Sequence, residues 1–375
     1  MKILIPASAP RRAKTAGAAE GGGRRVTSYD VAALAGVSQS AVSRCFKPGA
    51  SVSKATYARV MQAAQSLDYI PNAAARSLIT RRSNLVAVII SRLANPHAPA
   101  ALAELSRQLA SRGKRALLFT PERESELDAT LSDIWQYQVD GVIAAANLSE
   151  RHVAQCARRS VPLVIFNRCA ADVSAVVCDH AEATRLLVSR LAEAGHHQFA
   201  LIDEGEASAT ARERQRGARA RLAELDLPAP VVVAVEGGDD YAGGARGIRA
   251  IIAQLGRVPD AVICGNDIIA IGCLDTARHE LGINIPGKMS VAGCDAVDAS
   301  GWLSYNLTTL RQPIQKMAQA AAELLAALIE SRDPAPEKRV FCPQLVEGTT
   351  ARLQTADKLD LALRLELNKH GLMTM

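Results

Sequence analysis

Two different hydrophobic patterns divide the chain into a small N-terminal part and a large remainder. In residues 26–46, VTSYDVAALAGVSQSAVSRCF, apolar residues recur at helical spacing on both sides of a glycine, which predicts two short helices joined by a turn. Ala32 is small enough to let the helices approach, Gly36 can adopt the left-handed turn conformation, and Val42 closes the contact. Ser38 is placed to cap the second helix. The pattern predicts a helix-turn-helix.

A third helix follows a KPGAS turn and is predicted from about Ser53 to Asp68. Its apolar stripe, which is expected to face a core, consists of Tyr57, Val60, Ala64 and Leu67. Three helices in about 45 residues bury little surface. DNA or a dimer partner is therefore expected to stabilise this headpiece.

The segment after the third helix, YIPNAAARSL, spans residues 69–78. Pro71 or Asn72 can start a helix there, but a helix of about two turns is marginal on its own. Leu78, between arginines, would be an unusual exposed apolar residue unless it inserts at a base step of a minor groove. An ordinary interdomain linker is the alternative, and composition alone leaves both open.

From residue 85 onwards, short continuous apolar runs alternate with helical stretches, most of ten or more residues. The apolar runs are LVAVII (85–90), ALLF (116–119), GVIAAA (141–146), PLVIF (162–166), FALI (199–202), VVVAV (231–235), AVIC (261–264) and SVAG (290–293). Such strands, joined by helical crossovers, form parallel sheets that are covered on both faces. About 270 residues of this pattern exceed one sheet, so we expect two doubly wound subdomains that share crossover segments.

Polar residues follow the predicted strands, where ligands of such sheets bind. These residues include Ser91, Asn95, His97, Asn167, Arg168, Asn266, Asp267 and Asp295, with Arg212 at the start of a later helix. Each alone fits helix capping as well as ligand binding. Amides with carboxylates and an arginine together suit a polyhydroxylated or carboxylated small molecule. Two roles remain open for Arg212: its guanidinium could bond such a ligand with two hydrogen bonds, or it could form a salt bridge within its own RERQR cluster.

Charge separates the same two parts of the chain. The whole chain holds 44 Lys and Arg against 38 Asp and Glu, a formal net charge of +6. Residues 1–83 hold 13 of the basic and 3 of the acidic residues, which leaves 31 and 35 for the rest. A basic N-terminal part on a slightly acidic body indicates a polyanionic partner for the first part only.

Several other classes of protein are not expected. No apolar run approaches the roughly 20 residues of a membrane span, and the N-terminus lacks the apolar core of a secretory signal. The eight scattered cysteines show no C-x-x-C pair or metal spacing, so we expect reduced thiols in a cytoplasmic protein without metal or cofactor. No P-loop, G-x-S-x-G or H-E-x-x-H motif supports an enzyme. A periplasmic sugar-binding protein would share the body fold, but it would need a signal peptide and no helix-turn-helix.

From Val26 to Leu85 the chain resembles the headpiece and hinge of the lactose-repressor (LacI/GalR) family, in VTSYDVAALAGVSQSAVSRC and in VSKATYARVMQAAQSLDYIPNAAARSL. The resemblance implies a transcriptional regulator that binds double-stranded operator DNA as a homodimer, with a tetramer left open. It implies base contacts by Gln39, Ser40 and Arg44, which also lie on the outer face of the predicted second helix. It implies phosphate contacts by Thr27, Tyr29, Ser38, Ser43 and Asn72, and minor-groove insertion by Ala75 and Leu78. Arg44 is the expected guanine reader, because arginine can bond two atoms of that base.

The body resembles the same family more loosely, in the contexts VIFNR, TARER, CGNDIIAIG, VAGCDA and TTLRQP. The resemblance implies effector contacts by Ser91, Asn95, Asn167, Arg212, Asn266, Asp295 and Gln312. The lactose repressor has an aspartate where this chain has Asn167, and Tyr241 is the candidate for an aromatic residue that the family often places after the 231–235 strand. The effector is therefore not carried over. We expect a sugar or sugar acid that acts as inducer, while a corepressor of the purine type remains the alternative.

The predicted architecture is an all-α helix-turn-helix headpiece followed by an α/β effector domain of two doubly wound parallel-sheet subdomains, like that of periplasmic binding proteins. The expected segments are a disordered basic tail (1–24), the headpiece (25–69), a hinge helix or linker (70–83), the effector-binding and dimerisation domain (84–355) and a peripheral tail (356–375). The leucines of the last segment are too few and wrongly spaced for a tetramerising coiled coil. An effector that changes the angle between the subdomains would move the hinges, and this coupling is reciprocal.

Overall fold

The computed structural model describes residues 26–47, 49, 51–72, 82–91, 97–168, 172–205, 208–235, 240–331 and 335–353. The chain forms two compact units, residues 1–81 and residues 82–375. Both predicted tails, most of the predicted hinge, and the residues Ala75, Leu78 and Asn95 lie outside the described residues.

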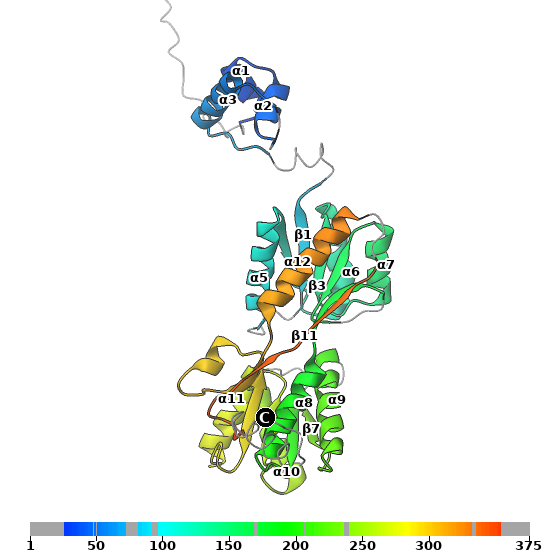
Figure 1. The fold of residues 1–375 in the computed structure, drawn as a ribbon, viewed down its shortest axis with the longest axis vertical. Coiled ribbons are helices and arrows are strands. Elements are labelled where there is room, and N and C mark those ends of the chain that lie inside the picture. Colours follow the sequence, from blue (N-terminus) through cyan, green and yellow to red (C-terminus); the bar gives the residue numbers. More distant parts are fainter. Residues whose placement is uncertain are drawn as a thin grey trace, which may run out of the picture. The chain divides into compact units, whose positions relative to one another are not determined.

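The first unit is the predicted three-helix headpiece (Figure 1). Its helices are α1 (Ser28–Ala35), α2 (Gln39–Cys45) and α3 (Lys54–Ser66). Gly36 has a φ of 62°, which confirms the left-handed turn between α1 and α2. The shared core consists of Val31, Ala32, Ala35, Val42, Val60, Ala63 and Ala64. The prediction that Tyr57 belongs to this core is wrong: its side chain is 48 % exposed, because the buried part of α3 begins a turn later, at Val60.

The second unit begins with a lobe built on a six-stranded sheet, which we call the first lobe. All described strand pairs in this sheet are parallel, in the order β11-β5-β4-β3-β1-β2. The strands are β1 (Leu85–Ile90), β2 (Arg115–Phe119), β3 (Gly141–Ala145), β4 (Leu163–Phe166), β5 (Ser174–Cys178) and β11 (Lys338–Phe341). One face packs against α5 (His97–Ser111) and α12 (Ile314–Glu330), and the other against α6 (Leu127–Gln136) and α7 (Glu150–Arg158).

The second lobe has a similar six-stranded sheet, in the order β12-β10-β9-β8-β6-β7, whose described strand pairs are parallel except for the antiparallel pair of β10 and β12. Its strands are β6 (Phe199–Asp203), β7 (Val231–Ala234), β8 (Ala261–Cys264), β9 (Ser290–Cys294), β10 (Thr308–Arg311) and β12 (Gln344–Val346). One face packs against α8 (His180–Glu193) and α9 (Ala209–Glu224), the other against α10 (Tyr241–Leu255) and α11 (Asp267–Asp275). The described part of the two lobes also contains three short helical turns: Glu124–Glu126 in the first lobe, and Thr276–Glu280 and Asp298–Gly301 in the second.

The chain passes between the two sheets three times, at residues 179–180, 312–313 and 342–343 (Figure 1). These crossovers confirm the predicted pair of doubly wound subdomains with shared segments. All eight predicted strands are present, while β5, β10, β11 and β12 were not predicted. Of the helices in the described part of the chain, none is long and apolar enough to span a membrane.

The chain enters the first lobe at a polar anchor around Asp140. Its carboxylate accepts hydrogen bonds from the Ser83 nitrogen (2.8 Å) and hydroxyl (3.0 Å), from the Asn84 nitrogen (3.0 Å) and from Lys114 Nζ (2.7 Å). Burial alone would raise the pKa of Asp140, but the bonds from Lys114 and Ser83 outweigh it and lower that pKa. The main chain is therefore fixed to the lobe from residue 83 onwards.

Candidate DNA-binding face and ligand site

The second helix of the headpiece presents polar side chains to solvent. The Ser38 hydroxyl accepts from the Ala41 nitrogen (3.3 Å), which confirms the predicted cap of α2. Ser40 and Arg44 are exposed. Gln39 is half-buried, and its Nε2 donates to the Ser28 hydroxyl of α1 (3.2 Å). The three predicted base readers thus lie on one short helix, with the Gln39 side chain held by its neighbour.

Most of the predicted phosphate-contacting residues are exposed on the headpiece. Tyr29 is 71 % exposed, and Ser38, Ser43 and Asn72 are also exposed. Thr27 differs, because both its nitrogen (2.8 Å) and its hydroxyl (2.7 Å) donate to the Asp30 carboxylate at the start of α1. A phosphate contact by the Thr27 hydroxyl would therefore compete with an internal carboxylate.

Three of the predicted effector residues form one chain of hydrogen bonds, which we call the crossover relay. Asn167 Nδ2, directly after β4, donates to Gln312 Oε1 (2.9 Å). Gln312 Nε2 in turn donates to Asp295 Oδ1 (2.7 Å), directly after β9. The relay joins a strand end of the first lobe to a strand end of the second through a residue of the second crossover.

The two ends of the crossover relay share an unusual backbone conformation. Asn167 has a φ of 54° and Asp295 a φ of 106°. Most residues other than glycine avoid this region, although asparagine and aspartate enter it more readily than others. Backbone strain of this kind gathers at ligand sites. The Asp295 nitrogen donates to the Leu310 carbonyl (2.9 Å), and Asn167 Oδ1 accepts from the Cys178 nitrogen (3.3 Å), so neighbouring strands hold both residues in place.

Asn266 and Ser91 make local contacts of the kind that helix capping and strand ends require. Asn266 is 4 % exposed, and its Oδ1 accepts from the Ile269 nitrogen (2.8 Å) as the cap of α11. The half-buried Ser91 hydroxyl donates to the Ala145 carbonyl at the end of β3 (3.3 Å). Both residues stand at strand ends, where these hydrogen bonds serve the fold.

Arg214, rather than Arg212, makes the buried contact of its helix. Arg214 and Asp203 are 4 % and 1 % exposed, and the guanidinium is bonded twice to the carboxylate, at 2.6 and 3.1 Å. Burial would lower the pKa of Arg214, but the charge of Asp203 outweighs it and raises that pKa. Arg212 is exposed on α9, two residues before Arg214 and therefore on another face of the helix.

Asp267 is a second buried carboxylate, which belongs to the polar residues after the predicted strands but not to the predicted effector contacts. It is fully buried, and it accepts from the Thr309 hydroxyl (2.5 Å) and the Val297 nitrogen (2.8 Å). Burial is the main reason why its pKa is raised to about 7. Its position after β8, beside Asn266, was the available sequence signal. Among the residues that the structure describes, no group of three or more His, Cys, Asp or Glu could hold a metal.

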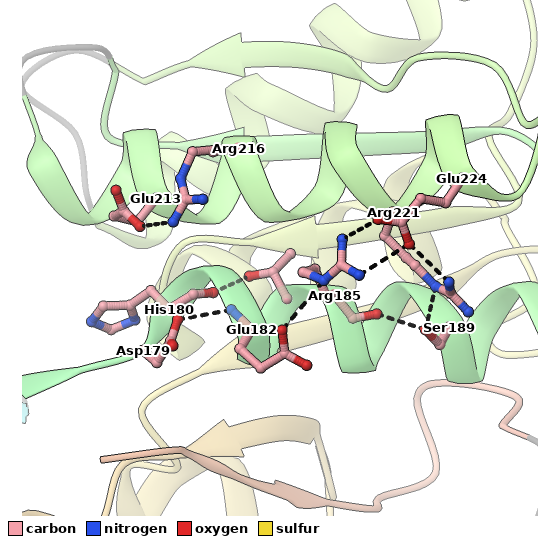
Figure 2. A network of polar contacts seen from close by, with 10 residues as sticks. Asp179, His180, Glu182, Arg185, Ser189, Glu213, Arg216, Arg221 and Glu224 are labelled. Atoms are coloured by element: carbon pink, nitrogen blue, oxygen red, sulfur yellow. Dashed lines mark hydrogen bonds and ion pairs between the residues drawn. The ribbon is translucent and has the colours of Figure 1, made fainter. Parts of the chain in front are cut away.

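An ion-pair network ties α8 to α9 on the surface of the second lobe (Figure 2). Arg185 of α8 is bonded twice to Glu224 of α9, at 2.8 and 3.0 Å. Arg221 bridges Glu224 (3.0 Å) and the Ser189 hydroxyl (2.8 Å). Arg185 and Arg221 together lower the pKa of Glu224 to about 2. These ion pairs therefore join the two helices into one layer.

Tyr241 does not lie with the crossover relay. Its hydroxyl donates to Asp275 (3.0 Å) at the last residue of α11, about 12 Å along the axis from the first residue of that helix. Tyr305 donates to the same carboxylate (3.2 Å). These residues line a pocket of about 310 Å³ on the second lobe, beside the exposed Trp302 and the fully exposed Leu303.

Comparisons with known proteins agree with both parts of this description. The family described as "Bacterial regulatory proteins, lacI family" matches residues 27–72, and the family "Periplasmic binding protein-like domain" matches residues 188–351. The probable HTH-type transcriptional repressor ExuR of Bacillus subtilis is 25 % identical over 88 % of this chain and 100 % of its own length. The HTH-type transcriptional regulator GalR of Escherichia coli is 29 % identical over 85 % of this chain and 94 % of its own.

Solved structures give the same relationship. A crystal structure of the lac repressor dimer bound to operator and the anti-inducer ONPF is 27 % identical, with a TM-score of 0.79 over 87 % of this chain and 99 % of that one. A complex of the transcriptional regulator CelR with cellobiose is 26 % identical, with a TM-score of 0.66 over 87 % of this chain and 100 % of that one. The headpiece, the two lobes and their order along the chain therefore match ligand-responsive transcriptional regulators.

Proposed function

Because the chain belongs to the lactose-repressor (LacI/GalR) family and is a ligand-responsive transcriptional repressor, we propose that it controls genes of sugar or sugar-acid catabolism and leaves a palindromic operator when an inducer binds. Its place of action would be the bacterial cytoplasm, where the DNA is. The observation that carries the proposal is the capped, exposed α2 helix within the residues that match the lacI family.

In this proposal α2 enters the major groove, and Gln39, Ser40 and Arg44 reach base edges. The phosphate contacts come from Thr27, Tyr29, Ser38, Ser43 and Asn72. The minor-groove contacts come from Ala75 and Leu78, which lie outside the described residues. Support comes from the exposure of Arg44 and Ser40 and from the bond that steadies Gln39 on α1.

The effector is proposed to bind where the crossover relay joins the lobes. Its contacts would come from Ser91, Asn95, Asn167, Arg212, Asn266, Asp295 and Gln312. A polyhydroxylated ligand can replace the bonds of the relay, because each hydroxyl both donates and accepts. The left-handed backbone at Asn167 and Asp295 supports this placement, and the cellobiose complex of the similar regulator CelR supports a polyhydroxylated ligand.

A homodimer is proposed to bring two headpieces to the two half-sites of the operator. The face of the second lobe around Trp302 and Leu303 suits a second copy of the chain. Leu303 is fully exposed, Trp302 is 60 % exposed and stacks on Tyr305, and the 310 Å³ pocket beside them can receive a side chain. The lac repressor in the similar structure is a dimer.

Selection of duplexes from a random pool by the full-length chain tests the proposal directly. We expect the recovered sites to be palindromic and a sugar or sugar acid to release them. Release measured for Arg212→Ala then tests the ligand site: operator binding should persist while the response to the inducer is lost. Recovery of no preferred sequence would contradict the proposed function, and a corepressor would instead strengthen binding.

A further inference from the structure

One buried imidazole at the junction of the lobes lacks a hydrogen-bond partner. His180 is the first residue of α8 and is 7 % exposed. Its Nε2 atom is inaccessible to solvent and makes no hydrogen bond. Figure 2 shows its ring beyond the start of α8, apart from the ion pairs that join α8 to α9. Buried ring nitrogens are normally paired, so this atom points to a missing partner.

The imidazole lies in a gap that one residue from each of the three crossovers helps to line: His180, Gln312 and Pro343. The other polar groups of the gap are already paired. Thr184 donates to the His180 carbonyl (2.8 Å), Arg214 is bonded to Asp203, and Gln312 belongs to the crossover relay. The gap is too small to hold a water molecule, so solvent does not supply the partner.

The surroundings of the ring favour a partner with negative charge. Burial is the main reason why the pKa of His180 lies well below its ordinary value, and the nearby Arg214, Arg168 and His97 lower it further. The ring is therefore neutral, and with the proton on Nε2 it is a donor. The N-terminus of the 14-residue helix α8 adds partial positive charge.

The carboxylates near the ring are occupied by other groups. Asp203 is paired with Arg214, Asp179 accepts from the Glu182 nitrogen (2.9 Å) as the cap of α8, and Asp295 accepts from Gln312 (2.7 Å). None of these bonds brings a carboxylate oxygen to His180 Nε2. None of these described carboxylates therefore serves as the partner of the ring.

We infer that His180 Nε2–H receives an acidic group, a carboxylate or a phosphate, of the effector. The inference rests on the proposed function and narrows the effector to an anionic, polyhydroxylated molecule. Because the gap is closed in this structure, an acidic group reaches Nε2 only when the crossovers move apart. Binding at His180 therefore changes the angle between the lobes, which is the movement that the proposed regulation requires.

Histidine side-chain NMR of the full-length protein tests the contact without a known effector. The signals of His180 are those absent from the spectrum of His180→Gln. Titration with inorganic phosphate, and separately with acetate, should shift the His180 Nε2 signal to saturation and leave the exposed His197 in place. The anion that saturates the His180 signal at the lower concentration shows whether the site prefers a phosphate or a carboxylate. A His180 signal that follows neither anion overturns the inference.

Release of the selected operator by glucose, gluconate, glucuronate and glucose 6-phosphate provides the functional test. An acid should release the wild-type protein, and His180→Leu should need at least tenfold more of it while binding the operator normally. His180→Gln retains a donor and should be affected less, and His197→Gln is the matched control. Release by glucose alone, or an unchanged acid response of His180→Leu, would overturn the inference and leave the proposed function standing. Failure of the full-length chain to bind any operator would instead contradict the proposed function, while the NMR titration would still report on His180.

Discussion

The pH dependence of stability should reveal the burial of Asp267. Its carboxylate is fully buried, and burial, together with the charge of Asp295, raises its pKa to about 7 although Thr309 and Val297 donate to it. In the unfolded chain the same carboxyl has an ordinary pKa of about 3.9. The difference between the two states is worth about 4 kcal/mol of unfolding free energy.

The direction in which stability changes with pH depends on which state, folded or unfolded, holds the Asp267 proton more tightly. The folded protein keeps the Asp267 proton at pH values where the unfolded chain has lost it, so this stabilisation is complete below about pH 4 and is lost as the pH rises through about 7. Asp267→Asn removes the titration. At about pH 5 the variant should be less stable than the wild-type protein by roughly 1–3 kcal/mol. The reason is that the side-chain amide nitrogen of the new asparagine would face either the Thr309 hydroxyl or the Val297 nitrogen, which are both donors. Towards pH 8 this deficit should vanish or reverse, since only the wild-type protein loses stability from this site.

Urea unfolding between about pH 4 and pH 8, followed by tryptophan fluorescence, measures the effect. The quantity of interest is the difference in unfolding free energy between the wild-type protein and Asp267→Asn, because other titrating groups cancel in it. Asp298→Asn, which alters an exposed carboxylate of the same lobe, is the control. A difference that stays constant across the range would refute the reasoning.

Three further changes test other parts of the structure. Arg44→Ala should cost about 1–3 kcal/mol of discrimination between the selected operator and other DNA in a gel-shift competition, whereas the nearby Lys47→Ala should weaken both alike. Arg214→Leu leaves Asp203 buried without its partner and should lower the unfolding free energy in urea by about 3–5 kcal/mol, and a loss below about 1 kcal/mol would contradict the buried pair. Leu303→Asp should yield folded monomers in analytical ultracentrifugation, and a stable dimer would exclude this face as the interface.

The fold could be predicted largely because its strands are apolar and its headpiece follows a strict helical pattern. Three of the four strands that escaped prediction lack that signal, whereas Ser174–Cys178 is as apolar as the predicted strands and was overlooked. Thr308–Arg311 reads as polar, but Thr308 and Thr309 are buried because their hydroxyls bond to Gly348 and Asp267. Lys338–Phe341 is an edge strand with alternating exposure. Its charged residues make this segment look like a loop in the sequence.

The proposed ligand site combines strand ends that the sequence could indicate with helix residues that it could not. Asn167, Asp295 and Gln312 were each selected from the sequence, and the structure joins them in the crossover relay. Arg212 and Arg214 stand two residues apart on α9, so spacing could not decide which of them faces the protein interior. His180 reads as one polar residue among several at a helix start, and only the folded arrangement of three crossovers shows that its ring is enclosed.

The anchor around Asp140 has a practical consequence for building hybrid regulators. Because Ser83 and Asn84 are fastened to the first lobe by their own backbone nitrogens, any foreign headpiece grafted before residue 83 meets a fixed point of attachment. The exchange needs no change to β1 or to the lysine that completes the anchor. Two hybrids whose linkers differ by one residue should therefore place the headpiece at different positions along the double helix. The body should keep its response to the same small molecule in both. The spacing of the half-sites that such hybrids select should therefore change with the length of the linker.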